Sequence, residues 1–256
     1  FVSGRRGLCW AFGGGVGWAV CGIAAATAAA VLIGVPRSAS LTFAPLRENE
    51  VRRIGATYWT LRLDTKYCWI PAGSVMLGHN PDKPRQWGSI RGDSPLRSFT
   101  LERGLWIGHS EVTQRLFEEV MGFNPSRFRG MQLPVDSVTY AEAQEFCRRL
   151  GDRLGVPVRL PTSDEWEFAA RGGAETVFHF GDDPLLMRRY GNVADRSNPD
   201  LVDAADWDDG HPFTCRDDNF ILNPWGLSDV HGNVWEWCQA PYLADPRDPA
   251  TAVEGM

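Results

Sequence analysis

The chain has 256 residues, with 26 lysines and arginines against 32 aspartates and glutamates, which gives a formal net charge of −6. Hydrophobic residues make up 43% and charged residues 23% of the sequence, and these values exclude a disordered or fibrous chain. The acidic balance argues against a nucleic-acid-binding protein, which normally shows a basic patch. The 11 tryptophans, 27 glycines and 17 prolines predict irregular backbone around a tryptophan-rich core.

The N-terminal part contains a long uncharged run. From Leu8 to Val35 there is no charged residue, and Arg5 and Arg6 precede this run. A membrane-spanning helix needs about 20 apolar residues, whereas the apolar core of an export signal has roughly 7–15. The length therefore favours a membrane anchor within residues 1–36, with its basic end in the cytoplasm. A cleaved export signal is the alternative, and both place the remaining chain outside the cytoplasm, either anchored or secreted.

The next segment, residues 37–66, has mixed charge and no hydrophobic period, and we expect it to form a linker or stalk. A compact domain is expected over residues 67–256. It begins with the extended apolar run Tyr67–Ile70, which Pro71 stops.

Three helices are expected, each preceded by a threonine N-cap and followed by a glycine: Thr113 to Gly122, Thr139 to Gly155 and Thr162 to Gly172. The second and third threonines are followed three residues later by Glu142 and Glu165, the spacing of a capping box. In the second helix, four apolar side chains follow the i, i+3, i+4, i+7 spacing of one buried face: Ala143, Phe146, Cys147 and Leu150.

After Gly173 the sequence holds no helical period, and residues 190–236 are rich in aspartate, asparagine and glycine. A structureless stretch of this size is uncommon inside a domain unless something organises it. Calcium is a candidate, because it takes six to eight oxygen ligands that include backbone carbonyls from tight turns. The same composition also occurs in solvated turns, so composition alone leaves both interpretations open.

The spacing of the cysteines and the absence of familiar catalytic motifs exclude several classes of protein. No C-x-x-C pair is present, so a zinc ribbon is excluded, and nucleophile-elbow, P-loop and H-E-x-x-H motifs are absent. Cys147 lies on the predicted buried helix face and is expected to pack as a small hydrophobic residue. Cys215 and Cys238 flank the oxygen-rich region and are candidates for a disulfide.

One run makes the chain recognisable. Residues Asn223–Trp237 resemble the N-x-x-G-L-x-D-x-x-G-N-V-W-E-W signature of the formylglycine-generating-enzyme (sulfatase-modifying factor) family. Four further blocks agree with that family in the same order: Ala72–Gly78, Ser110–Thr113, Leu133–Val138 and Arg159–Gly173. The resemblance covers about Tyr67 to Cys238. It implies an α+β fold, a variant of the C-type lectin fold with little regular secondary structure.

The resemblance also implies two calcium sites. The first would use the side chains of Asn192 and Asp209 with the carbonyl groups of Val193 and His211. The second would use the side chains of Asp229 and Glu236 with the carbonyl groups of Gly232 and Val234. Trp235 is a candidate for contact with a substrate. One departure lies close to the first site, at Cys215–Asp217, where relatives show A-P-V.

Active members of this family oxidise a cysteine of a sulfatase-type protein to formylglycine with O₂ and Cu(I) bound by two cysteines. That pair follows an R-G-G-S-W motif, and this sequence ends at Met256 about where the motif is expected, so we expect a piece truncated at its C-terminus. Copper is therefore expected only if a region beyond Met256 supplies the pair. The alternative is a non-catalytic lectin-like module that binds a protein or peptide. An accessory domain of an iron oxidase is less supported, because no H-x-x-x-H pattern is present.

Overall fold

The computed structural model describes residues 65–78, 95–198, 204–216 and 219–239, together with four short strands nearer the N-terminus. Those four strands are β1 (Thr27–Ala29), β2 (Leu32–Ile33), β3 (Ala44–Pro45) and β4 (Tyr58–Leu61). The later strands are β5 (Thr65–Ile70), β6 (Gly73–Leu77), β7 (Arg97–Leu101), β8 (Leu105–Gly108), β9 (Val158–Arg159) and β10 (Trp235–Trp237). The helices are α2 (Gln114–Met121), α3 (Tyr140–Leu154), α4 (Ser163–Arg171) and the 3₁₀ helix η1 (Pro184–Arg189).

The three predicted helices are confirmed, and local chemistry sets their ends. Each preceding threonine has extended backbone and accepts a hydrogen bond from the amide three residues further on. In α3 and α4 the glutamate at that position also accepts from the threonine amide, which completes both capping boxes. The closing glycines adopt left-handed backbone, with φ of 85°, 69° and 58° in chain order.

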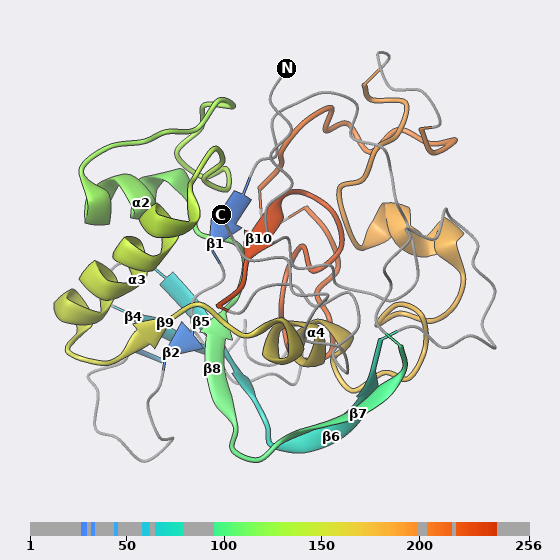
Figure 1. The fold of residues 1–256 in the computed structure, drawn as a ribbon. Helices are drawn as coiled ribbons and strands as arrows, with labels where there is room; N and C mark the ends of the chain where they lie inside the picture. The colour runs from blue at the N-terminus through green and yellow to red at the C-terminus, as the bar shows by residue number, and fades with distance from the viewer. Residues whose placement is uncertain are drawn as a thin grey trace.

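Strands from distant parts of the chain form the largest sheet. Its order is β3-β4-β5-β8-β2-β9, and every neighbouring pair in it is antiparallel. Strands β6 and β7 form a separate antiparallel hairpin, which curves below α4 in Figure 1, and β1 pairs in parallel with β10. Long-range pairing therefore brings the end of the described chain beside its beginning.

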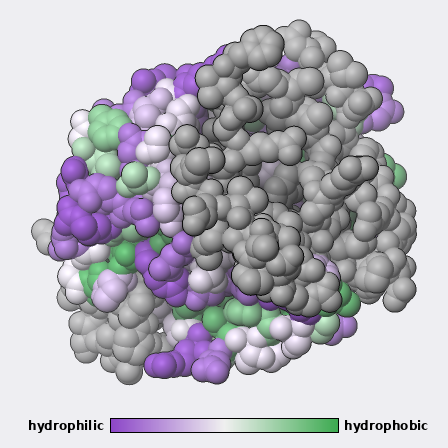
Figure 2. Space-filling model, viewed as in Figure 1, coloured by the Kyte–Doolittle hydropathy of each residue, from purple (hydrophilic) through white to green (hydrophobic). Residues whose placement is uncertain are grey.

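Two hydrophobic clusters form the core. In the first, α2 and α3 lie side by side, and Phe117 stacks on Phe146 with ring centroids 5.4 Å apart. The second cluster gathers around α4, where Phe168 meets Phe99 of the β6–β7 hairpin and Trp225 of the irregular region. The outer face of α3 is polar, and hydrophilic residues gather over it in Figure 2.

Residues between α4 and β10 have little regular structure, as predicted. Apart from η1 and isolated bridges, the described part of this region is loop held by side-chain hydrogen bonds. Asn223 is fully buried and is the clearest example. Its side-chain amide donates to the carbonyl groups of Ala169 and Ala170, and its Oδ1 accepts from the amides of Trp225 and Leu227.

The structure differs from the expected boundary at the N-terminal side of the domain. Strands β3 and β4 fall within the segment 37–66, and β4 pairs with β5 over four residues. Strands β1 and β2 fall within residues 8–35, most of which lie outside the described residues. Of the helices in the described ranges, none has the length and apolar character needed to cross a membrane.

The candidate disulfide between Cys215 and Cys238 is wrong. Cys215 is a buried free thiol, whereas Cys238 is disulfide-bonded elsewhere. The physical reason is placement, since Asn233 holds the Cys215 backbone in the irregular region while Cys238 packs in the core cluster around α4. Cys147 is buried on the inner face of α3, as predicted.

Candidate functional site

The two predicted ligand sets lie on loops that run against each other at backbone contact. The amide of Asn233 donates to the carbonyl oxygen of Asn192 at 2.7 Å. A Cβ atom added at Gly232 would collide with that same oxygen, and one added at Gly191 would collide with the carbonyl oxygen of His231. Both positions therefore need glycine, and this close approach brings together residues about forty positions apart in the sequence.

In the first set, the carboxylate of Asp209 accepts hydrogen bonds from the backbone amides of two other predicted ligand residues, His211 and Val193. Its Oδ1 accepts from the amide of His211 at 2.8 Å, and the amide of Val193 also bonds to this carboxylate. Asn192, which is buried, donates its side-chain amide to the carbonyl oxygen of Phe213 at 2.7 Å. The structure thus brings Asn192, Val193, Asp209 and His211 together on two facing loop segments.

One oxygen of Asp209 has no hydrogen-bond donor. Its Oδ2 is buried without a partner, while Oδ1 is occupied by the loop. The pKa of Asp209 is raised to about 6, chiefly by burial and also by the nearby Asp195 carboxylate, while the backbone donors His211 and Val193 oppose this change. A buried carboxylate oxygen without a donor is costly unless a cation occupies the space beside it. This feature fits calcium at the first set.

The second set occupies a tight turn in which three residues have left-handed backbone. Asp229, Gly232 and Asn233 have φ of 51°, 86° and 55°, so this part of the loop turns sharply. Asp229 and Glu236 are buried. Asp229 accepts from the hydroxyl of Ser228 at 2.9 Å, and Glu236 accepts from the indole of Trp166 at 3.1 Å.

Burial dominates the electrostatics of Glu236. The pKa of this carboxyl is raised to about 8, chiefly by burial and also by the Asp229 carboxylate, while the hydrogen bond from Trp166 opposes the change. A bound cation would favour the ionised form of both acids. The donor set of carboxylates and turn carbonyls also fits calcium, because this ion prefers hard oxygen ligands.

A third buried carboxylate, Glu111, was missed as a site residue. It belongs to the Ser110–Thr113 block that carried the family resemblance, directly after strand β8. Burial raises its pKa well above the usual range, and the carboxylates of Asp229 and Glu236 add to this effect. Its place in that family block was the sequence signal that could have found it.

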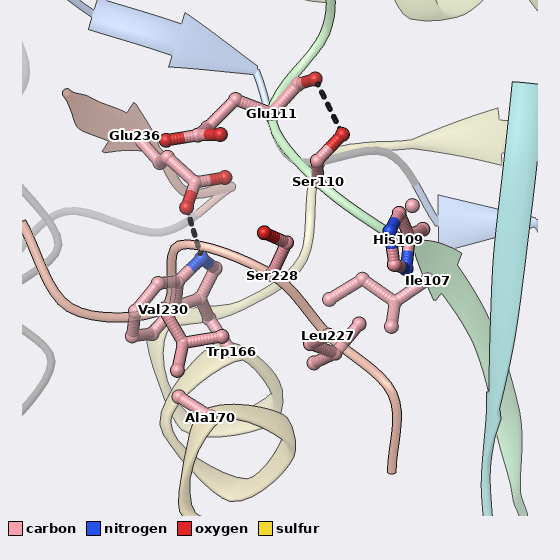
Figure 3. A pocket seen from close by; sticks show the side chains of 11 residues that line it. Ile107, His109, Ser110, Glu111, Trp166, Ala170, Leu227, Ser228, Val230 and Glu236 are labelled. Atoms are coloured by element: carbon pink, nitrogen blue, oxygen red, sulfur yellow. Dashed lines mark hydrogen bonds between the residues drawn. The ribbon is translucent and has the colours of Figure 1, made fainter. Parts of the chain in front are cut away.

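Two of these acids, Glu111 and Glu236, line a small recess shown in Figure 3. Glu111 and Glu236 lie on one side of this recess, and His109 lies on the opposite side. His109 bonds through Nδ1 to the carbonyl oxygen of Gly226 at 2.6 Å, which orients its ring. The recess is lined by Ser110, Ser228 and Trp166 as well, so it combines acidic, hydroxyl and aromatic groups.

The described residues contain no cluster of three or more histidine, cysteine, aspartate and glutamate side chains arranged to hold a metal ion. The predicted calcium sets do not depend on such a cluster. Each set combines one or two carboxylates with amide or backbone carbonyl oxygens, and calcium sites commonly use such mixtures.

Copper does not fit the cysteines that the structure describes. Cys68, Cys147 and Cys215 are buried, and burial raises the pKa of Cys147 to about 12 and also raises the pKa of the other two. Copper(I) binding needs thiolates, and Cys238 is engaged in a disulfide. We derive no copper chemistry from these residues.

The two tryptophans of β10 differ in exposure. Trp237 is buried and donates to the carbonyl oxygen of Val138 at 2.9 Å. Trp235 is only half-buried, beside Glu236. Its contact with a substrate stays a prediction.

Comparison with protein families identifies the class. The family described as "Sulfatase-modifying factor enzyme 1-like domain" matches residues 61–254. The chain therefore belongs to this family, as its signature predicted, and it has the α+β fold of that family.

Three relatives illustrate the range of named activities. A formylglycine-generating enzyme of Streptomyces coelicolor is 35% identical over 131 residues, which are 47% of this chain and 39% of the relative. An inactive C-alpha-formylglycine-generating enzyme 2 of Bos taurus is 33% identical over 120 residues, 46% of this chain and 36% of the relative. Chaperone protein LppX of Paenibacillus barcinonensis is 28% identical over 172 residues, 52% of this chain and 61% of the relative. The chain thus spans less than two thirds of the length of each.

Two solved structures share the fold. PvdO from Pseudomonas aeruginosa matches with a TM-score of 0.63 and 22% identity, over 78% of this chain and 79% of that one. Treponema denticola variable protein 1 matches with a TM-score of 0.58 and 23% identity, over 73% of this chain and 77% of that one.

Proposed function

We propose that this domain binds a protein or peptide ligand outside the cytoplasm and that two calcium ions stabilise its loops. The buried, donor-free Oδ2 of Asp209 is the observation that carries the calcium part. Asn192, Val193, Asp209 and His211 would hold one ion. Asp229, Gly232, Val234 and Glu236 would hold the other. Calcium would neutralise buried carboxylates and fix the turns that bear them.

Chelation tests the calcium proposal. A ligand present at about 100 times its Kd stabilises a protein by about 2.7 kcal/mol. At about 2–4 °C per kcal/mol for a chain of this size, removal of each ion should lower Tm by about 5–10 °C. We expect Asp209→Asn and Glu236→Gln each to remove part of this shift.

Asp208→Asn is the matched control, because Asp208 neighbours Asp209 but is exposed. It should leave the calcium-dependent shift unchanged. An unchanged Tm of the parent chain on chelation, with no calcium retained by metal analysis, would refute both sites.

A binding role without turnover has support from two observations. The relatives include proteins named as an inactive enzyme and as a chaperone. Trp235 is half-buried in β10, where its exposed part is accessible to a ligand.

The test of ligand binding uses a cysteine-containing peptide of sulfatase type. We expect the peptide to bind and Trp235→Ala to weaken binding about tenfold or more, as loss of an aromatic anchor does. Phe123→Ala is the control, since Phe123 is an exposed aromatic residue that follows α2. Equal binding by both variants would exclude Trp235 from the ligand surface.

The second candidate function is oxidation of that cysteine to formylglycine. The similarity to proteins named formylglycine-generating enzymes favours it. It would require copper and a cysteine pair from outside this sequence. A longer chain that carries such a pair, incubated with the same peptide, Cu(I) and O₂, should form an aldehyde detectable by mass spectrometry, and an unchanged peptide would contradict this second candidate.

The proposed location, either membrane-anchored or secreted, is supported by the 28 uncharged residues from Leu8 to Val35. The disulfide at Cys238 also suits an oxidising compartment. Protease added to intact cells should degrade an anchored domain, and a secreted one should appear in the medium. Protection of the domain until the cells are lysed would refute this location.

A further inference from the structure

The contact between the two loops has a consequence for calcium binding. Asn192 belongs to the first ligand set, and Asn233 stands between Gly232 and Val234 of the second. Their backbones are joined by the hydrogen bond from the Asn233 amide to the Asn192 carbonyl oxygen. We propose that the two calcium sites are coupled through Asn233, so that filling one site raises the affinity of the other. This inference rests on the calcium sites of the proposed function.

The side chain of Asn233 connects both sets with a third segment. Its Oδ1 accepts from the Cys215 amide at 2.9 Å and from the Asn192 side-chain amide at 3.3 Å. Its Nδ2 donates to Glu111 Oε1 at 3.1 Å and to the Cys215 carbonyl oxygen at 3.3 Å. A movement of Asn233 therefore changes contacts of the first set, of the buried acid Glu111 and of the Cys215 loop together.

The sign of the coupling follows from ordering. Asn233 has φ of 55°, an uncommon conformation for a residue other than glycine, and it directly follows Gly232. A cation held by Gly232 and Val234 fixes this turn. A fixed turn also holds the Asn192 carbonyl oxygen and side-chain amide in place, because both bond to Asn233. The ion that binds the first set then meets a loop at Asn192 that is already ordered.

Repulsion between two divalent cations opposes this effect. Five buried or half-buried carboxylates lie in or beside the two sets: Asp195, Asp209, Glu111, Asp229 and Glu236. When ionised they carry more negative charge than two calcium ions carry positive charge, so attraction to this cluster offsets the repulsion. We therefore expect the ordering effect to decide the sign, and the coupling to be positive.

Calcium titration calorimetry of single-site variants tests the coupling. Asp209→Asn disables the first site, and Glu236→Gln disables the second. Each variant should bind one calcium ion at its intact site. The Kd of that intact site should be at least about fivefold higher than in the parent chain with its other site filled, which is within the usual range of coupling energies. The two factors should be equal, because thermodynamic coupling is reciprocal.

Asn233→Gly tests the route of the coupling, because glycine keeps the left-handed backbone and removes only the side chain. In an Asn233→Gly background, adding Asp209→Asn should weaken the second site less than it does in the parent chain, because the side-chain contacts are lost while the backbone bond to Asn192 remains. Asn219→Gly serves as control, since Asn219 is exposed and bonds within its own loop, to the Arg216 carbonyl oxygen and to the Cys215 side chain, without contacting Asn192 or Glu111 in the described hydrogen bonds. Circular dichroism establishes that each variant is folded, and the Asp209→Asn and Glu236→Gln pair tests coupling without altering Asn233.

The outcomes separate the two proposals. Failure of the parent chain to bind calcium would overturn the calcium sites and the coupling with them. Two sites whose Kd values do not change when the other is disabled would overturn the coupling alone. Undiminished coupling in the folded Asn233→Gly variant would overturn the assignment to the Asn233 side chain.

Discussion

Replacement of Asn223 by alanine should destabilise the domain more than any exposed asparagine replacement. Asn223 is fully buried and its side chain makes four hydrogen bonds. Alanine would leave the buried amide of Leu227 and the partly buried amide of Trp225 without their Oδ1 acceptor. At about 1–3 kcal/mol for each orphaned buried group, these two amides alone amount to about 4 kcal/mol. Such a loss is a large part of the stability of a typical domain, about 5–15 kcal/mol.

Urea unfolding in excess calcium, followed by circular dichroism, measures this effect. Thermal unfolding should agree, with a Tm decrease of about 10 °C for the Asn223→Ala variant. The control is Asn219→Ala, because Asn219 is exposed and its side chain bonds within its own loop, to the carbonyl oxygen of Arg216 and to Cys215. If the Asn223→Ala and Asn219→Ala midpoints coincide, the reasoning from the hydrogen-bond network is wrong.

Asn223→Asp separates the donor half of this network from the acceptor half. The aspartate keeps an acceptor for Trp225 and Leu227 but places a carboxylate oxygen against the carbonyl oxygens of Ala169 and Ala170. We expect a loss comparable to that of alanine at neutral pH. The loss should be smaller at acid pH, where the protonated carboxyl can donate one hydrogen bond. A pH-independent loss would show that those carbonyl contacts contribute little.

Three further predictions test other contacts. Gly232→Ala should cost several times more stability than Gly210→Ala in urea unfolding, because both glycines have positive φ but only Gly232 faces a carbonyl oxygen where the Cβ would lie; equal losses would refute the close loop contact. Arg171→Met should cost about 3–5 kcal/mol by leaving the buried Glu167 carboxylate without its 2.7 Å ion pair, and a second change, Glu167→Leu, should recover part of this loss; no recovery would contradict the reasoning. Burial lowers the pKa of His179 to about 4, below its unfolded value near 6.5. The neutral form of His179 therefore stabilises the fold fully above about pH 6.5. This contribution, up to about 3 kcal/mol, is lost as the pH falls toward 4. The urea midpoint of His179→Gln should therefore depend less on pH in this window than that of the parent chain, and identical profiles would exclude His179 as the titrating group.

The helices could be predicted because their signals are local. The capping glutamates lie three residues from Thr139 and Thr162, and the buried face of α3 repeats every three to four residues. Gly155 and Gly172 end these helices at the predicted positions with left-handed backbone. All of this information is contained within a few helical turns.

The sheet could not be predicted in the same way. Strand β4 pairs with β5, although its four residues lie in a segment of mixed charge that was expected to form a stalk. Strand β2 has only two residues and pairs with β8 and β9, more than seventy and one hundred residues away. Strands this short carry too few alternating positions to predict a partner.

The candidate site, like the fold, could be predicted only where its signals are local in the sequence. The oxygen-rich loops and their candidate ligands were recognisable from composition and from the family signature, but Glu111 was not, because Asp229 and Glu236 lie more than one hundred residues further along the chain. The sequence also could not show that Cys215 and Cys238 do not pair with each other. Two cysteines that flank one region can pack in different parts of the core, as they do here.

The sequence by itself determined the family, the three helices with their ends, and the irregular character of the region after α4. Those features depend on side-chain spacing over a few residues or on a continuous signature. Only the tertiary structure decided that the loop at Asn192 meets the loop at Asn233 and that three acids share one buried site. The physical reason is that such contacts need chain segments far apart in sequence to be brought together by packing around a common core, and no local propensity records which segments will meet.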